Sequence, residues 1–215
     1  MVKHTVGLKK IKVGHTGTLD PKATGLLLLC TGRATKQIEQ LMLDRKEYVA
    51  TLKFGATTPS FDLEHPEDAH YPYEHITQGM LEEALREFLG TTLQVPPIFS
   101  AVSVGGKRAY DLARKGKDCQ LEGKPITIHE LEVVSFEPPY ATLRISCGKG
   151  TYIRSLARDL GERLHSGAYL TALRRTQLGS VRVEDSLTLA ELPDFLAHAE
   201  LNEEGFDPII PPSSK

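Results

Sequence analysis

A carboxylate in a glycine-rich loop is the first feature of this sequence that could carry chemistry. Residues 14–21 read Gly-His-Thr-Gly-Thr-Leu-Asp-Pro, so Asp20 stands directly before a proline. Pro21 has a fixed φ and disfavours the helical region for the residue before it, which keeps the Asp20 backbone extended. Binding and catalytic residues occur disproportionately often on loops, so Asp20 is a candidate functional residue. An Asp-Pro turn and a helix cap are structural alternatives for the same residue.

An arginine in a later segment offers a partner for such a carboxylate. Residues 151–164 place apolar side chains every three or four positions, which predicts an amphipathic helix. Tyr152 and Arg154 would border its packed face. A buried arginine requires a carboxylate partner, whereas a surface arginine extends its charged end into water, and the residues alone leave both possibilities open.

Two basic segments have the composition of a nucleic-acid contact. Arg174 and Arg175 form a pair before Thr176 that is suited to phosphate. Residues 106–116 (GKRAYDLARKG) mix an aromatic ring with basic residues, Lys107 among them, and RNA is bound by phosphate contacts combined with base stacking. We therefore expect Lys107 and Arg174 to contact RNA, although each segment alone is a weak indication.

Several other enzyme motifs are excluded by a missing residue or a wrong spacing. Residues 14–19 are similar to the aspartyl-phosphate loop Asp-Lys-Thr-Gly-Thr-Leu, but Gly14 stands where that loop has its nucleophile. Residues 147–151 lack the Gly-x4-Gly-Lys-Ser/Thr spacing of a Walker loop. The three histidines within 65–75 are five residues apart and have no cysteine beside them, so we expect no metal site.

The composition is that of an ordinary globular chain of 215 residues, with 25% charged and 40% hydrophobic residues. The longest apolar run, Leu26–Cys30, is far shorter than the ~20 residues of a membrane span, so we expect no membrane partner. Three widely spaced cysteines suit free thiols in a reducing compartment, and we expect a cytoplasmic location.

Charge alternates along the chain in blocks. Residues 1–60, 61–94, 95–182 and 183–215 have net charges of +6, −7, +6 and −7, although the total is only −2. Such blocks could build one basic and one acidic face, and a polyanion responds to the local field of the basic face. The alternative is that helices and loops simply differ in charge.

The elements that must position these residues follow from periodicity and from the glycines and prolines. The irregular alternation of strands and helices predicts the α+β class, with a mixed, largely antiparallel sheet and flanking helices. We expect a structured loop over 16–25, strands over 48–54, 126–136 and 141–147, helices over 34–43, 77–90, 109–115 and 151–164, an exposed acidic loop over 57–73, an extended segment over 95–103, a short helix and then a strand within 170–183, and a frayed end over 201–215.

Taken in order, five segments of the chain closely resemble the TruB-type tRNA pseudouridine synthases, which act at position 55 in the T-arm of tRNA. They are GHTGTLDPKATGLLLLCTGRATK (14–36), KEYVATLKFGATTPSFD (46–62), PPIFSAVSVGGKRAYDLARKG (96–116), GKGTYIRSLARDLGERL (148–164) and LTALRRTQLG (170–179). They span nearly all of residues 1–183. The resemblance implies a pseudouridine synthase catalytic fold with its active site in a cleft across a long sheet.

The resemblance also implies the reaction and the residues that perform it. Uridine in the T-arm would become pseudouridine without a metal or an organic cofactor. Asp20 matches the family's catalytic nucleophile, Tyr48 its active-site tyrosine, and Arg154 the arginine that pairs with the aspartate.

Three further matches imply contacts with the substrate. His15 matches the histidine that fills the space left by the flipped base, and Leu173 matches the leucine that packs near that base. Tyr152 matches the aromatic residue two before the arginine. We expect the T-arm of tRNA as partner, no obligate protein partner, and a monomer.

General chemistry is consistent with these roles. Flipping a base out of a folded RNA loop costs a few kcal/mol. Breaking the C1′–N1 bond develops oxocarbenium-like charge, which a carboxylate stabilises, so Asp20 must be ionised and a neighbouring arginine favours that form. Whether Asp20 adds to the sugar or removes a sugar proton stays open. Tyr48 is a candidate floor for the base and a candidate base for the C5 proton, directly or through water.

The expected domain organisation is a catalytic domain over 1–183 and an acidic tail over 184–215, which is too short for the family's C-terminal RNA-binding module. The Lys-Pro-x-Gly-x-Thr-Ser segment that the family has ahead of its signature is missing, so we expect an N-terminally truncated domain. Ser103 stands where the family usually has a basic residue. A non-catalytic tRNA-binding factor on the same scaffold and a phosphoaspartyl enzyme, which Gly14 disfavours, are the competing hypotheses.

Overall fold

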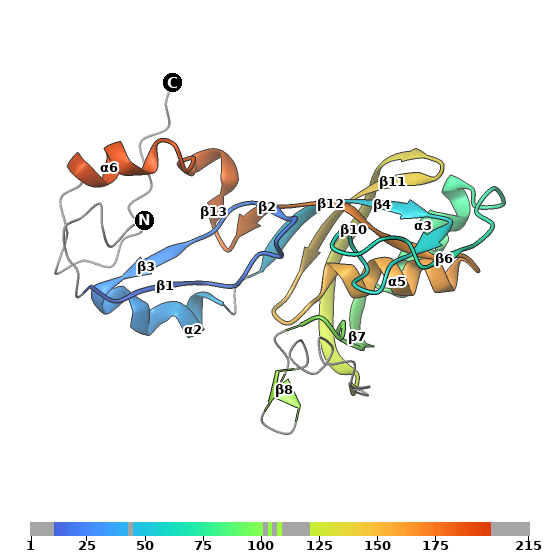
Figure 1. The fold of residues 1–215 in the computed structure, drawn as a ribbon, viewed down its shortest axis with the longest axis horizontal. Helices are drawn as coiled ribbons and strands as arrows, with labels where there is room; N and C mark the ends of the chain where they lie inside the picture. Colours follow the sequence, from blue (N-terminus) through green and yellow to red (C-terminus); the bar gives the residue numbers. More distant parts are fainter. Residues whose placement is uncertain (1–10, 43–44, 101–102, 105–106, 109–120, 199–215) are drawn as a thin grey trace.

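The computed structural model describes residues 11–42, 45–100, 103–104, 107–108 and 121–198, the short stretches 103–104 and 107–108 as backbone only (Figure 1). Its elements are, in chain order, β1 (Val13–His15), β2 (Thr24–Gly25), β3 (Leu29–Thr31), η1 (Gly32–Gln37), α2 (Ile38–Leu41), β4 (Lys46–Phe54), β5 (Ala56–Thr57), β6 (Ala69–His70), α3 (Gln78–Glu87), β7 (Gly90–Gln94), β8 (Ser103–Val104), β9 (Lys107–Arg108), β10 (Lys124–Glu137), β11 (Tyr140–Cys147), α5 (Ile153–Arg163), β12 (Ala168–Leu178), β13 (Val181–Arg182), η2 (Val183–Asp185) and α6 (Leu192–His198).

A seven-stranded sheet forms the centre of the molecule. Its strands follow the order β13-β12-β4-β11-β10-β7, in which all neighbours are antiparallel, and β2 pairs with β12 in parallel. The sheet is therefore mixed and largely antiparallel, and the α+β class is confirmed.

Strand β4 shows why this sheet has one face in the core. Its residues alternate between buried and half-buried over the whole strand, which is the two-residue period of a strand packed on one side. The strands expected over 48–54, 126–136 and 141–147 are confirmed as β4, β10 and β11. Pro138 and Pro139 form the turn between β10 and β11.

Two helices cover the core face. Helix α5 packs against β12 and β4, and α3 packs against β10 and α5. Helix α5 buries the apolar side that its periodicity predicts, and α3 begins where Thr77 Oγ1 accepts a hydrogen bond from the Met80 N–H at 3.3 Å. The helices expected over 77–90 and 151–164 are therefore confirmed.

The expectation of a short helix followed by a strand within 170–183 is wrong. Strand β12 is continuous from Ala168 to Leu178 and pairs with β4 along its length. Its sequence contains alanine, leucine and arginine, which favour helix locally. Pairing with the central strand satisfies its backbone and overrides that local preference.

The first part of the expected exposed loop over 57–73 is also different. Thr58, Ser60 and Asp62 are buried, because this segment folds back against the rest of the domain, where the Leu170 N–H of β12 donates to the Phe61 carbonyl at 3.0 Å. The prediction of an exposed loop from acidic composition therefore fails for the first residues of this segment.

The N-terminal part of the described chain is an antiparallel pair of strands, β1 and β3, that extends away from the main sheet, with η1 and α2 beside it (Figure 1). The helix expected over 34–43 is thus a 3-10 turn followed by one short α-helical segment. Cys30 and Cys147 are buried free thiols. The expected helix over 109–115 and the expected frayed end over 201–215 lie outside the described residues. Among the helices that are described, none has the length and apolar character needed to cross a membrane.

Candidate active site

The centre of the candidate site is an ion pair between Asp20 and Arg154. Arg154 Nε donates to Asp20 Oδ2 at 3.0 Å and Nη2 donates to Oδ1 at 2.9 Å, so two parallel bonds join the groups. Asp20 lies in the loop between β1 and β2, where its carbonyl accepts from the Ala23 N–H at 2.9 Å across a turn with Pro21 in its second position. The Arg154 side chain is 5% exposed and that of Asp20 is 34% exposed. The carboxylate is therefore open to a ligand while its partner is sealed.

The fixed position of Arg154 follows from its other contacts. It lies in the first turn of α5, and its guanidinium also donates to the carbonyls of Ser60 at 3.3 Å and Phe99 at 3.1 Å. A planar guanidinium with this many partners has little freedom to rotate. Of the two possibilities left open by the sequence, Arg154 is therefore the buried arginine with a carboxylate partner, and not a surface arginine.

A second carboxylate, Asp62, completes the polar cluster. Its Oδ2 lies 3.8 Å from Arg154 Nε and has no hydrogen-bond partner within the described residues, whereas its Oδ1 accepts from Ser60 Oγ at 2.6 Å and from the Glu64 N–H at 2.9 Å. Arg154 thus lies between two aspartates. Sequence reasoning missed Asp62, although it is the last residue of the second segment that resembles the TruB-type enzymes.

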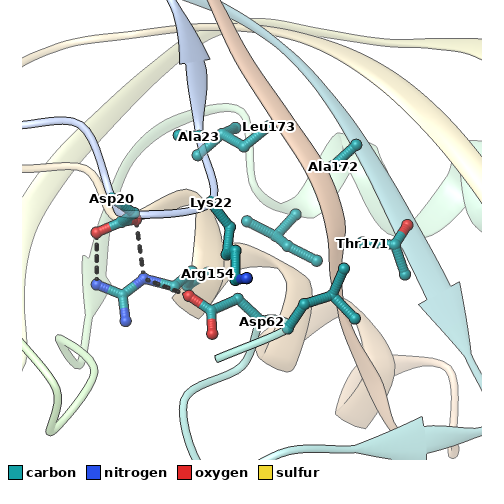
Figure 2. Close-up of a pocket in the computed structure, with 10 residues that line it drawn as sticks. Asp20, Lys22, Ala23, Asp62, Arg154, Thr171, Ala172 and Leu173 are labelled. Atoms are coloured by element: carbon teal, nitrogen blue, oxygen red, sulfur yellow. Dashed lines mark hydrogen bonds and ion pairs between the residues drawn. The ribbon is translucent and has the colours of Figure 1, made fainter. Parts of the chain in front are cut away.

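An open pocket adjoins the ion pair (Figure 2). The β1–β2 loop contributes Asp20, Lys22 and Ala23, the segment after β5 contributes Asp62 and Leu63, α5 contributes Arg154, and β12 contributes residues 170–173. Leu173, which was expected near the target base, is thus part of the pocket wall. The pocket combines ionic groups on one side with apolar groups on the other.

Tyr48 lies on the core face of β4, is 8% exposed and does not line the pocket. Burial raises the pKa of its phenol to about 12, and a hydrogen bond and the charge of Arg175 act in the opposite direction. The nearby Asp20 charge raises the same pKa further. The phenol is therefore neutral at neutral pH.

The two arginines of the predicted basic pair have different environments. In the register with β4, Leu173 lies opposite Ala50, Arg174 opposite Val49 and Arg175 opposite Tyr48, so Arg174 is on the other face of the strand. Arg174 is exposed, whereas Arg175 is buried and donates to main-chain carbonyls. The interpretation of both as a phosphate-binding pair is therefore wrong for Arg175.

The three remaining predicted residues are at different places in the fold. His15 is exposed at the end of β1 and does not line the pocket. Tyr152 immediately precedes α5 and is half-buried, with its main chain bonded to the Gln94 side chain. Lys107 is in β9, and its side chain lies outside the described part of the structure.

This arrangement can stabilise positive charge that develops on a ligand. Asp20 is held in one orientation, faces an open pocket and has a second carboxylate behind its arginine. The apolar wall formed by residues such as Leu170 and Leu173 suits a flat, uncharged group.

The family comparison identifies two matching family models. Residues 3–153 match the model described as "TruB family pseudouridylate synthase (N terminal domain)", and residues 154–215 match "tRNA pseudouridylate synthase B C-terminal domain". A tRNA pseudouridine synthase B of Phocaeicola vulgatus is 57% identical over 198 residues, covering 92% of this chain and 84% of that protein. The corresponding protein of Bacteroides thetaiotaomicron is 54% identical over 203 residues, covering 93% and 85%.

Solved structures show the same fold. A chain of the crystal structure of a Cbf5-Nop10-Gar1 complex superimposes with a TM-score of 0.65 at 29% identity, over 90% of this chain and 48% of that one. A chain of an H/ACA RNP bound to a substrate RNA containing 2′-deoxyuridine gives a TM-score of 0.64 at 26% identity, over 90% and 47%. The present chain therefore spans about half the length of these solved chains.

Proposed function

The chain belongs to the TruB family of pseudouridylate synthases, and on that premise we propose that it converts uridine to pseudouridine at position 55 in the T-arm of tRNA, with Asp20 as the catalytic carboxylate. Isomerisation of uridine in tRNA is the activity for which its relatives are named. The family relation confirms the resemblance found in the five sequence segments. The position in tRNA and the role of each residue are our proposal.

The observation that carries this proposal is the bidentate ion pair at the mouth of a pocket. A purely structural carboxylate would be enclosed together with its arginine, but Asp20 keeps about a third of its side chain exposed, at 34%, while Arg154 is almost fully covered. The pair thus presents a fixed negative charge to whatever enters the pocket. This is the arrangement needed to stabilise a cationic sugar.

The reaction exchanges one bond of the nucleoside for another. The C1′–N1 bond breaks, a C1′–C5 bond forms, C5 loses a proton and N1 gains one, so no electrons are gained or lost overall. Asp20 would either add to C1′ or remove a proton from C2′ of the ribose, and both roles require an ionised carboxylate facing the sugar. The two differ in their isotope effect, because only proton removal breaks a C2′–H bond.

The surrounding residues would hold the base while it turns. The Tyr48 ring would lie beneath it and Leu173 beside it, since a released uracil rotates more freely against apolar surfaces than within fixed hydrogen bonds. A phenol with a pKa of about 12 suits the role of floor better than that of a direct base for the C5 proton. His15 would fill the space that the flipped base leaves, Tyr152 would contact the substrate, and Lys107 and Arg174 would bind the RNA backbone.

The test is the variant Asp20→Asn, assayed by release of tritium from C5-labelled uridine in a T-arm stem-loop. We expect the rate to fall by at least about 10³-fold while binding to the stem-loop persists, because the amide keeps the shape but not the charge. Chemical mapping of the product should place pseudouridine at position 55. Deuterium at C2′ of that uridine should produce a primary isotope effect in the wild-type protein only if Asp20 removes the C2′ proton.

Asp194→Asn is the matched control, since Asp194 is exposed on α6 and absent from the pocket. It should turn over at the wild-type rate. Normal turnover by Asp20→Asn would refute the proposed mechanism. A wild-type protein that bound the stem-loop but released no tritium would instead be the non-catalytic tRNA-binding factor.

A further inference from the structure

Arg175 is a buried charge in the middle of β12. Its side chain is 1% exposed and is the largest among the fully buried side chains of the described residues. No carboxylate within the described part of the chain forms an ion pair with it. Burying a guanidinium without a counter-ion is costly, and an apolar side chain of the same length would fill the space at lower cost. The arginine at this position therefore needs a reason beyond packing.

The hydrogen bonds of Arg175 reach both sides of the loop that carries Asp20. Its Nε donates to the Leu26 carbonyl at 2.7 Å and its Nη2 donates to the Gly17 carbonyl at 3.2 Å. Gly17 precedes the catalytic aspartate in this loop and Leu26 follows it. One planar group thus connects the two ends of the loop.

The main chain of the same residue bonds to the loop as well. The Leu26 N–H donates to the Arg175 carbonyl at 2.9 Å, and Gly25 pairs with Arg175 in the parallel β2–β12 ladder. A Cβ on Gly25 would lie 2.1 Å from the Arg175 carbonyl oxygen, and the φ of Gly25 is +100°. Only glycine therefore permits this approach of the loop to β12.

Arg175 is also a neighbour of Tyr48 in the sheet. The two residues lie directly opposite each other in the β4–β12 register, and Arg175 acts to lower the pKa of the Tyr48 phenol, against the effect of burial. Arg175 thus bonds to the loop of one proposed active-site residue and lies opposite another in the sheet.

We propose that Arg175 is a positioning residue, whose buried guanidinium fixes the Asp20 loop against β12, next to Tyr48 of β4. The inference rests on the proposed function and adds a residue to the same site. A lysine cannot replace it, because a single ammonium on a flexible chain does not present the flat fork of donors that spans the two carbonyls of Gly17 and Leu26. Misplacement of a catalytic group by about 1 Å lowers a rate by about 10²-fold.

The experiment compares Arg175→Met and Arg175→Lys with the wild-type protein, using tritium release for kcat and KM on the T-arm stem-loop. We expect kcat to fall by about 10²-fold in both variants with KM within about threefold of wild type, since the buried guanidinium is out of reach of the RNA. Methionine has a similar volume to arginine and carries no charge that must be removed from water on folding. The Arg175→Met variant should therefore keep its melting temperature. Arg182→Lys is the control, because Arg182 is exposed on the neighbouring β13 and should leave both constants unchanged.

Hydrogen exchange supplies a readout that does not depend on activity. Amide exchange of Thr16 and Leu26, whose N–H groups bond to the Leu28 and Arg175 carbonyls, should become at least about tenfold faster in Arg175→Met, while β4 and β11 stay protected. Unchanged kcat in a folded variant would overturn the proposal, and so would a rise in KM alone. Loss of the folded state in both variants would overturn it too, by making Arg175 a core residue. Absence of tritium release from the wild-type protein would count against the proposed function, and the exchange result would still decide the role of Arg175.

Discussion

Four charged side chains line the pocket, and their balance bears on how an anionic substrate enters it. Asp20 and Asp62 face the Arg154 guanidinium, and Lys22 extends from the loop turn into the same space (Figure 2). Without Lys22, the pocket would have one net negative charge. A nucleotide arrives with a phosphate on either side of its ribose, so Lys22 removes a repulsion that would oppose binding.

Lys22→Gln is therefore expected to weaken binding of the T-arm stem-loop without lowering kcat. The loss of one phosphate contact should reduce the slope of log K against log[salt] by about 0.7, the value for a single-stranded segment. Titration at several salt concentrations measures this slope. Lys124→Gln, at the start of β10 and outside the pocket, is the control. An unchanged slope for Lys22→Gln would mean that its ammonium does not contact phosphate.

At the scale of elements, the site depends on how helix α5 begins. Tyr152 precedes the helix and no side chain of its own caps the first turn. Gln94, at the end of β7, instead holds the main chain just before the helix: its Nε2 donates to the Tyr152 carbonyl at 3.1 Å and its Oε1 accepts from the Tyr152 N–H at 2.8 Å. An edge strand thus fixes the helix end from which Arg154 projects.

Gln94→Ala should lower both stability and turnover. The lost amide leaves the N–H of the half-buried Tyr152 without its partner, which costs about 1 kcal/mol in the free energy of unfolding. Because Arg154 follows two residues later, we expect kcat to fall by about tenfold or more. Urea unfolding and tritium release measure the two effects. Gln78→Ala, which removes an exposed amide from α3, should change neither. A stable Gln94→Ala protein with full activity would show that α5 is positioned without this contact.

At the scale of the whole molecule, the site and the hydrophobic core share residues. Tyr48 belongs to the core cluster around β4, β11 and α5, and Leu173 packs against that cluster. The pocket is therefore an opening at the edge of the core. A change in the ionisation of a site residue should accordingly change the free energy of unfolding of the entire domain.

Alkaline unfolding tests this connection. The pKa of Tyr48 is raised to about 12 in the folded protein, against about 10 in an unfolded chain. Its contribution to stability is thus complete below about pH 10 and is lost as the pH rises towards 12, because the unfolded state releases the proton first. The shift corresponds to about 2 to 3 kcal/mol.

Tyr48→Phe should show a flatter decline of stability between about pH 9 and pH 11.5 than the wild-type protein, as measured by urea unfolding. Tyr140→Phe serves as control, since it removes a hydroxyl from a ring that is 45% exposed. An equally steep decline in Tyr48→Phe and the wild-type protein would show that the buried phenol does not control alkaline stability.

The sequence by itself determined the features that depend on neighbouring residues. The alternation in β4 and the repeat in α5 indicated strand and helix correctly, and the resemblance of the segments around Asp20 and Arg154 indicated that these residues form a pair. The catalytic roles of Asp20, Tyr48 and Arg154 and the substrate contacts of the other residues remain predictions.

Tertiary structure decided the rest. Residues 170–178 have the local preferences of a helix and become a strand because β4 offers them hydrogen-bond partners. Arg174 and Arg175 are adjacent and chemically identical, yet one faces solvent and the other is buried, because successive side chains in a strand point to opposite faces. Asp62 reaches Arg154 only through the folding of its segment against β12. Burial and long-range pairing are properties of the folded chain, and periodicity along the sequence does not contain them.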